Sequence, residues 1–149
     1  MPVSALFIHD VPIECINQAA ITYHVPATLI VSVLLTENGR AGTASLNKNG
    51  TYDYGPMQIN TIWLDKVRPY GFTKEDIQYN ACVNVSVGTW ILSQRIADSN
   101  NLSFGVGSYN SYSLPQNYKY SSKVSENYKL LEQYLSSPTK KEVDMTGRS

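Results

Sequence analysis

PATLIVSVLLTENGRAGTASLNKNGTYDYGPMQIN, residues 26–60, is the stretch that decides the fold expected for this chain of 149 residues. Pro26 suits the first turn of a helix, where a missing N–H costs nothing, and apolar residues then recur at helical spacing as far as Glu37. Asn49-Gly50 is a strong signal for a tight hairpin turn. The stretch therefore predicts a helix, a small β element and a short buried return over residues 55–60.

Glu37 is the first residue of this stretch that suggests chemistry. It continues the apolar face of the helix set by Ile30, Val33 and Leu34, and it lies in the last turn, at the negative end of the helix dipole. Both surroundings disfavour the carboxylate anion, so we expect a raised pKa. A carboxyl that stays protonated near neutral pH can act as a general acid. The alternative is an exposed glutamate at a helix end, and position alone leaves both open.

The composition indicates an ordinary globular domain. Hydrophobic residues make up 42% and charged residues 16%, and 149 residues suffice for one domain with its own core. Twelve basic and twelve acidic residues give a formal net charge of zero, so no overall field attracts nucleic acid or an anionic surface. We expect no nucleic-acid partner and, since no apolar stretch approaches a membrane span, no membrane insertion. Eleven tyrosines are many for this length, and their rings suit sugar faces.

The remaining periodic segments are mostly helical. We expect helices over residues 13–23, 60–67, 80–98 and 118–135, a capped turn over 73–76, and a short helix from Ser103. Asn60, Thr73 and Asn80 are the expected N-caps of the segments that they begin. There is no βαβ alternation and no repeat, so the fold class is α+β, mostly α. We expect residues 13–136 to form the domain, residues 1–12 an N-terminal extension, and residues 137–149 a flexible tail.

Three motifs together resemble a known family. Glu37 ends a helix, Gly55-Pro56-Met57-Gln58-Ile59-Asn60 follows about twenty residues later, and Tyr109-Asn110 comes much later. This order is similar to that of the lytic transglycosylases of the soluble-transglycosylase, lysozyme-like superfamily. The similarity extends over roughly residues 15–135 and is greatest to the small specialised members that accompany secretion, conjugation and type IV pilus systems. It implies a lysozyme-like fold with a small β-hairpin beside a cleft.

The resemblance also implies a reaction. The substrate is the glycan strand of peptidoglycan, cleaved at the β-1,4 bond between N-acetylmuramic acid and N-acetylglucosamine. Glu37 first protonates the leaving oxygen and then removes the proton of the muramyl 6-hydroxyl, which closes a 1,6-anhydro ring. Neither water nor a second acid is needed, and no metal or other cofactor is expected. We expect local wall remodelling during assembly of an envelope-spanning machine, with components of a secretion, conjugation or pilus apparatus as partners.

Further site residues follow from the resemblance. Gln58 is expected at the cleft floor, Tyr109 with its hydroxyl toward the catalytic carboxyl or the reacting sugar, Asn110 in the adjoining turn, and Tyr120 near the carboxyl. Tyrosines at helical spacing are usually core residues, which remains the alternative for both. Met57, Ile59 and Trp63 are expected in the core.

The sequence departs from the family pattern at three places. Asn38 stands where Ser is usual, Pro56 where Leu is usual, and Ser111-Tyr112 where a small residue and Gly are usual. Asn38 still offers a polar side chain to the substrate, whereas Pro56 removes a backbone N–H and stiffens the motif. None of these changes removes the acid.

Two other functions stay open. Asp53, a carboxylate in the expected hairpin, would activate water if it lay across the cleft from Glu37, and the protein would then be a lysozyme-type muramidase. The three departures leave room for a peptidoglycan-binding assembly module without turnover. The mass of the released products separates these possibilities.

Cys15 and Cys82 are the only cysteines, and with two histidines they form no metal-ligand pattern. A disulfide between the first helix and the central one agrees with the resemblance to proteins that act on the wall outside the cytoplasm, and it implies a periplasmic location. Two separately buried thiols are the alternative. The opening MPVSALFIHDVP lacks the basic region and long apolar run of a signal peptide, so we expect a leader to have been removed.

Overall fold

The computed structural model describes residues 6–137 and shows a mostly helical domain with two small antiparallel sheets. This confirms the α+β, mostly α, class. In chain order the elements are β1 (Phe7–Ile8), β2 (Val11–Pro12), α1 (Ile13–Tyr23), α2 (Ala27–Glu37), β3 (Ala44–Leu46), β4 (Tyr52–Tyr54), β5 (Ile59–Asn60), the 3-10 turn η1 (Thr61–Trp63), α3 (Leu64–Val67), the 3-10 turn η2 (Arg68–Tyr70), α4 (Lys74–Tyr79), α5 (Ala81–Ala97), α6 (Leu102–Ser108) and α7 (Leu114–Leu135).

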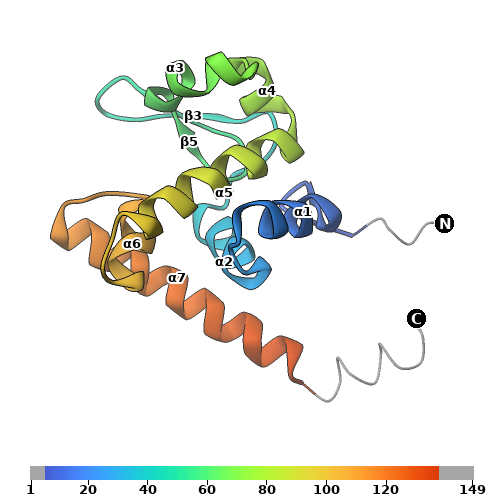
Figure 1. Cartoon of the computed structure of the whole chain (residues 1–149), viewed down its shortest axis with the longest axis vertical. Coiled ribbons are helices and arrows are strands. Elements are labelled where there is room, and N and C mark those ends of the chain that lie inside the picture. The colour runs from blue at the N-terminus through green and yellow to red at the C-terminus, as the bar shows by residue number, and fades with distance from the viewer. Residues whose placement is uncertain (1–5, 138–149) are drawn as a thin grey trace.

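Helix α5 crosses the middle of the molecule and separates two groups of elements (Figure 1). The sheet β3-β4-β5, with α3 and α4, lies on one side of it. On the other side α1 packs against α5, and α7 runs along both α2 and α6. This arrangement brings the end of α2 close to the sheet and to the start of α7, although these segments are far apart in the sequence.

The three-stranded sheet contains the hairpin predicted at Asn49-Gly50. Strand β3 pairs with β4 and β4 pairs with β5, both antiparallel, with Ser45 opposite Asp53 and Asp53 opposite Asn60. In the turn, Gly50 has φ +87°, which favours glycine. The sheet places Asp53 and Asn60 side by side.

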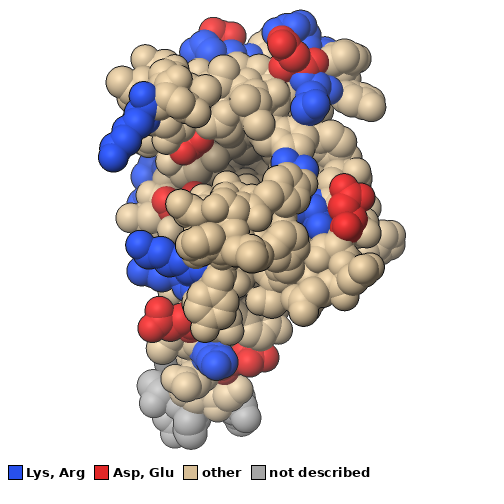
Figure 2. All heavy atoms as spheres, turned by 90° about the vertical axis from the view of Figure 1, so that its left-hand side faces the viewer, with Lys and Arg blue, Asp and Glu red and all other residues tan. Residues whose placement is uncertain are grey.

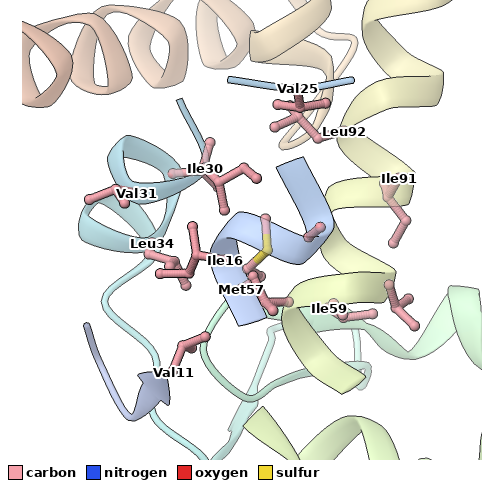
Figure 3. Close-up of a cluster of buried hydrophobic side chains, with 14 of the residues drawn as sticks. Val11, Ile16, Val25, Ile30, Val31, Leu34, Met57, Ile59, Ile91 and Leu92 are labelled. Atoms are coloured by element: carbon pink, nitrogen blue, oxygen red, sulfur yellow. The ribbon is translucent and has the colours of Figure 1, made fainter. Parts of the chain in front are cut away.

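The core joins the helices to the turn before β5. Figure 3 shows Met57 pointing into a cluster with Ile16 of α1, Leu34 of α2 and residues of α5. Met57 is fully buried, and Gly88 of α5 leaves the space that it needs, since a Cβ there would lie 2.5 Å from the Met57 sulfur. Met57 therefore anchors the turn in the helical core. The expectation that Met57 and Ile59 pack in the core is confirmed.

Residues 7–12 differ from the expected extension. They form a two-stranded hairpin whose turn residues His9 and Asp10 both have positive φ, and Val11 is completely buried. The Asp10 carboxylate accepts a hydrogen bond from the Ala41 N–H at 3.1 Å, so the hairpin supports the loop that follows α2. The packed domain thus begins before Ile13. The sequence gives little sign of it because His-Asp is not a typical hairpin turn and the strands have two residues each.

Several helix ends also differ from expectation. The single helix predicted over residues 60–67 consists of η1 and α3, with η2 directly after it, and α7 begins at Leu114 rather than near Tyr118, with a proline in its first turn. The predicted caps are present: the Asn60, Thr73 and Asn80 side chains each accept a hydrogen bond from a backbone N–H in the following turn. The expected tail, apart from Ser137, lies outside the described residues. No helix within residues 6–137 has the length and apolar character that a bilayer crossing requires.

The disulfide between Cys15 of α1 and Cys82 of α5 is present, with the two Cα atoms 5.4 Å apart. It joins positions separated by 67 residues at the place where α1 packs against α5. A bridge over a loop of this length restricts the unfolded chain strongly.

We expect reduction of the disulfide to lower the free energy of unfolding by about 2–5 kcal/mol, because the unfolded chain regains its freedom. Chemical denaturation with and without reductant measures the change. The Cys15→Ala/Cys82→Ala variant serves as the control, since reductant should not affect it. Equal stability of the parent with and without reductant would contradict this account.

Candidate active site

A cleft of about 940 Å³ opens between the three-stranded sheet and the helices α2, α5 and α6. Figure 2 shows the molecule hollowed at this face, with acidic atoms visible at the hollow and basic atoms at its border. The lining residues come from the end of α2, the sheet with the β3–β4 turn, η1, α5, and the segment from the end of α6 to the first turn of α7. We call this hollow the cleft. Glu37, Asp53, Gln58, Tyr109 and Asn110 all line it, whereas Asn38 and Tyr120 do not.

Glu37 is the last residue of α2, and its carboxyl is partly buried at the edge of the cleft. Burial is the main cause that raises its pKa, to about 7. The hydroxyl of Tyr120 donates a hydrogen bond to Oε2 at 2.5 Å, which lowers the pKa, while the negative charge of Asp53 raises it. Glu37 therefore exchanges a proton close to neutral pH, as the sequence predicted.

Two tyrosines lie beside Glu37 with different partners. The rings of Tyr109 and Tyr120 stack, with centroids 6.3 Å apart and planes inclined by 27°. Tyr120 contacts the carboxyl, but the Tyr109 hydroxyl donates instead to the backbone carbonyl of Met57 at 2.7 Å. The Tyr109 hydroxyl is thus directed to the tight turn rather than to the carboxyl, because the turn supplies a carbonyl acceptor, and its contact with the sugar stays a prediction.

Burial is the main cause that raises the pKa of both tyrosines well above the ordinary value, and the charge of Glu37 adds to it. Both hydroxyls therefore stay protonated and remain hydrogen-bond donors at any pH where the protein functions. Tyr120 is therefore a constant donor to the Glu37 carboxyl.

Gln58 ends the tight turn that follows β4. Gly55 and Gln58 both have positive φ, +69° and +51°, and the Gln58 backbone N–H and side-chain Nε2 both donate to the Gly55 carbonyl at 3.0 Å. The amide thus braces its own turn while it faces the cleft. Gly39 lies against this turn, because a Cβ there would collide with the Gly55 carbonyl oxygen. This close backbone approach sets Glu37 beside Gln58.

Asn84 of α5 holds the turn from the other side, and the sequence analysis missed it. Its side chain is fully buried and makes three hydrogen bonds: Nδ2 donates to the carbonyls of Tyr54 at 2.9 Å and Ile77 at 2.8 Å, and Oδ1 accepts from the Met57 N–H at 2.8 Å. A side chain at Gly55 would collide with it. The sequence did contain a signal, because an asparagine between two valines in a buried helix needs hydrogen-bond partners inside the protein.

Asp53 and Asn110 both line the cleft. Asp53 Oδ1 accepts a hydrogen bond from Asn60 Nδ2 at 2.9 Å, so its carboxylate is fixed in the cleft that contains Glu37. The Asn110 N–H donates to the Gly107 carbonyl at 3.0 Å and closes the turn after α6. Trp63 packs edge-on to Trp90, with ring centroids 5.9 Å apart, but it also lines the cleft.

Residues 14–131 match the family model described as Transglycosylase SLT domain. The chain belongs to this family. It is 27% identical to the invasion protein IagB of Salmonella typhimurium over 124 residues, covering 80% of this chain and 78% of that protein. It is 27% identical to the protein IpgF of Shigella flexneri over 114 residues, covering 76% and 75%, and 29% identical over 104 residues to a peptidoglycan-binding-like protein of Escherichia coli O157:H7, covering 64% and 62%.

Membership in the SLT family supports a function of the lytic-transglycosylase type and makes peptidoglycan the implied substrate. Within residues 6–137 of this SLT domain, no three His, Cys, Asp or Glu side chains are grouped closely enough to hold a metal ion.

We expect Asn84→Ala to lower the free energy of unfolding of the SLT domain by about 3–5 kcal/mol, because it removes the buried partner of the Met57 N–H and of the Tyr54 and Ile77 carbonyls. Chemical denaturation measures the loss. Gln94→Ala, on an exposed part of the same helix, should change stability by no more than about 0.5 kcal/mol. If both variants were equally stable, Asn84 would not be the anchor of the turn.

We expect Glu37 to make the stability of the SLT domain fall as the pH rises. Its folded-state pKa of about 7 lies above the ordinary value of 4.5, so the folded protein holds this proton more tightly than the unfolded chain. Glu37→Gln cannot ionise and still accepts from Tyr120. The free energy of unfolding of the variant minus that of the parent should therefore be larger at about pH 8 than at about pH 4, by up to about 3 kcal/mol. The same difference at both pH values would contradict the raised pKa.

Proposed function

We propose that this SLT-family protein is a peptidoglycan lytic transglycosylase. It cleaves the β-1,4 bond between N-acetylmuramic acid and N-acetylglucosamine and leaves 1,6-anhydromuramic ends. The observation that carries the proposal is the carboxyl of Glu37, whose pKa is raised to about 7 and which lies beside Tyr120 at the edge of a large polar cleft. Such a carboxyl can give up a proton and take one back at the same pH.

In the first step Glu37 transfers its proton to the glycosidic oxygen as the bond to the muramyl anomeric carbon breaks. The carboxylate that remains keeps the hydrogen bond from Tyr120, which stabilises the anion. In the second step the carboxylate removes the proton of the muramyl 6-hydroxyl, and that oxygen bonds to the anomeric carbon. Glu37 gives up one proton and regains one, so the reaction requires neither water nor a second carboxylate.

The lining of the cleft supports a sugar polymer as the substrate. Amides recur along it, on Asn47, Asn49, Gln58, Asn60 and Gln116, together with the rings of Trp63, Tyr109 and Tyr112. Amides both donate to and accept from hydroxyl groups, and aromatic faces suit the apolar faces of sugar rings. Asn38, by contrast, is an exposed helix cap outside the lining, so we assign it no contact with the sugar.

We place the activity in the periplasm, in local wall remodelling for an envelope-spanning machine. The Cys15–Cys82 disulfide supports an oxidising compartment, and the name of the invasion protein IagB supports a link to such a machine. Components of a secretion, conjugation or pilus apparatus are the partners this role needs.

Asp53 supports a second candidate, hydrolysis by a muramidase. Its carboxylate lines the same cleft as Glu37, and a base that activates water in an inverting enzyme lies across the cleft from the acid. Asp53 is, however, held by a hydrogen bond from Asn60 within the sheet. In the transglycosylase mechanism its only role is to raise the pKa of Glu37.

We expect Glu37→Gln to release soluble muropeptides from purified sacculi at least about 100-fold more slowly than the parent, because the amide cannot donate the proton that the proposed first step requires. Glu132→Gln, on an exposed part of α7, is the matched control and should retain the parent rate. Mass spectrometry of the parent's products should find anhydro ends. Products heavier by one water would favour the muramidase, and sedimentation with sacculi without any release would indicate a binding module.

A further inference from the structure

Arg95 lies on the cleft side of α5 between two aromatic rings. Its guanidinium carbon is 4.9 Å from the ring centroid of Trp63 and 5.0 Å from that of Tyr112. Trp63 belongs to η1 and Tyr112 to the segment between α6 and α7, so the guanidinium bridges opposite walls of the cleft. All three residues line the cleft, and no part of the sugar chemistry described above uses Arg95.

The charge of Arg95 has no acidic partner in the part of the chain that the structure describes. The ion pair seen over residues 6–137 joins Arg68 to Asp65 and does not involve Arg95. The Nε–H of Arg95 is buried and has no hydrogen-bond acceptor. A guanidinium charge without an acidic partner at a binding cleft favours an anionic ligand, and since Nε has almost no access to the cleft, such a ligand would contact the terminal N–H groups.

The two rings determine which ligand fits. Cation–π contacts on Trp63 and Tyr112 hold the guanidinium in place without using its N–H groups. These N–H groups form a rigid fork that matches the two oxygens of a carboxylate. The side chain is therefore positioned in advance for a planar anion, and little side-chain freedom is lost when the anion binds.

We propose that Arg95 binds a carboxylate carried by the lactyl substituent of a muramyl residue. This inference rests on the proposed function, since it takes the peptidoglycan glycan strand as the ligand. In that strand N-acetylglucosamine is neutral, whereas the lactyl group of muramic acid ends either in a free carboxylate or in a peptide that bears carboxylates. Arg95 thus selects strands that contain muramic acid over neutral strands and fixes the register in which they enter the cleft.

A purely structural role is the competing explanation, in which Arg95 only holds Trp63 and Tyr112 in place. Loss of Arg95 would then weaken every glycan alike, whether charged or neutral. A carboxylate subsite instead affects only ligands with a carboxylate. The ratio of affinities for charged and neutral strands separates the two roles, and a melting temperature for each variant checks that the fold is intact.

The experiment measures binding in the Glu37→Gln background, so that no strand is cleaved. Three glycans of similar length serve as probes: strands with stem peptides, strands whose peptides have been removed to leave free lactyl carboxylates, and chito-oligosaccharide, which has neither. We expect Arg95→Gln to lower the ratio of affinity for a carboxylate-bearing strand to affinity for chito-oligosaccharide by about tenfold. Lys66→Gln is the matched control, because its Nζ lies 5.9 Å from the same Trp63 ring but Lys66 is exposed and does not line the cleft. It should leave the ratio unchanged.

Each result decides the matter. A lower ratio for peptide-bearing strands alone identifies the stem-peptide carboxylates, and a lower ratio for the peptide-free strands identifies the lactyl carboxylate. Equal weakening for all three probes, or no weakening for any, overturns the proposal. If the parent releases no anhydro products from sacculi but the Arg95-dependent ratio persists, the proposed reaction fails and the carboxylate site stands. If anhydro products form and the ratio does not depend on Arg95, the site fails and the reaction stands.

Discussion

The buried amide of Asn84 is the interaction on which the cleft depends. It makes hydrogen bonds to three backbone groups, the carbonyls of Tyr54 and Ile77 and the N–H of Met57. A backbone that turns sharply in a protein interior needs such partners, because unpaired polar groups there are costly. With Asn84 in α5 the turn after β4 takes one course, Met57 enters the core, and the Gly55 carbonyl meets Gly39. Contacts between backbones, rather than between long side chains, thus fix the distance from the end of α2 to the cleft floor.

Within this backbone arrangement, opposing effects set the pKa of Glu37. Burial and the charge of Asp53 favour the neutral carboxyl, and the hydrogen bond from Tyr120 favours the anion. Burial alone would give a carboxyl that holds its proton too tightly to act as a base afterwards, and a fully hydrogen-bonded carboxylate would be too weak an acid. Helix α7 carries Tyr120, whose hydrogen bond lowers the pKa again. This helix packs along α2, and Asn127 Nδ2 donates a hydrogen bond to Thr36 Oγ1 at 2.9 Å. The position of α7 therefore adjusts the pKa of the acid.

The sequence was informative where the signal is local. The helix that ends at Glu37, the caps at Asn60, Thr73 and Asn80, and the Asn49-Gly50 hairpin depend on neighbouring residues, and all are present. Contacts between segments that are far apart in the sequence could not be predicted from such local patterns. Tyr120 reaches Glu37 across 83 positions, and Tyr109 reaches Met57 across 52, so which tyrosine would contact the carboxyl depended on how α6 and α7 pack. Asn84 and Arg95 were missed for the same reason, since their partners lie on other elements.

The three departures from the family pattern also find their physical reasons in the backbone. Asn38 caps α2 with φ 55°, a left-handed conformation that asparagine tolerates better than most residues, so the change from the usual Ser suits the chain course. Pro56 lies buried in the turn whose bonds come from the N–H groups of Met57 and Gln58, and its missing N–H leaves that network intact. After Tyr109-Asn110, the Ser111 carbonyl accepts from Asn117 Nδ2 at 2.9 Å, which holds the loop without the usual glycine. That loop carries Tyr112, one of the two rings around Arg95. The third departure thus supplies one wall of the cleft, beside the only guanidinium nitrogen of the described chain that is both buried and without an acceptor, Arg95 Nε.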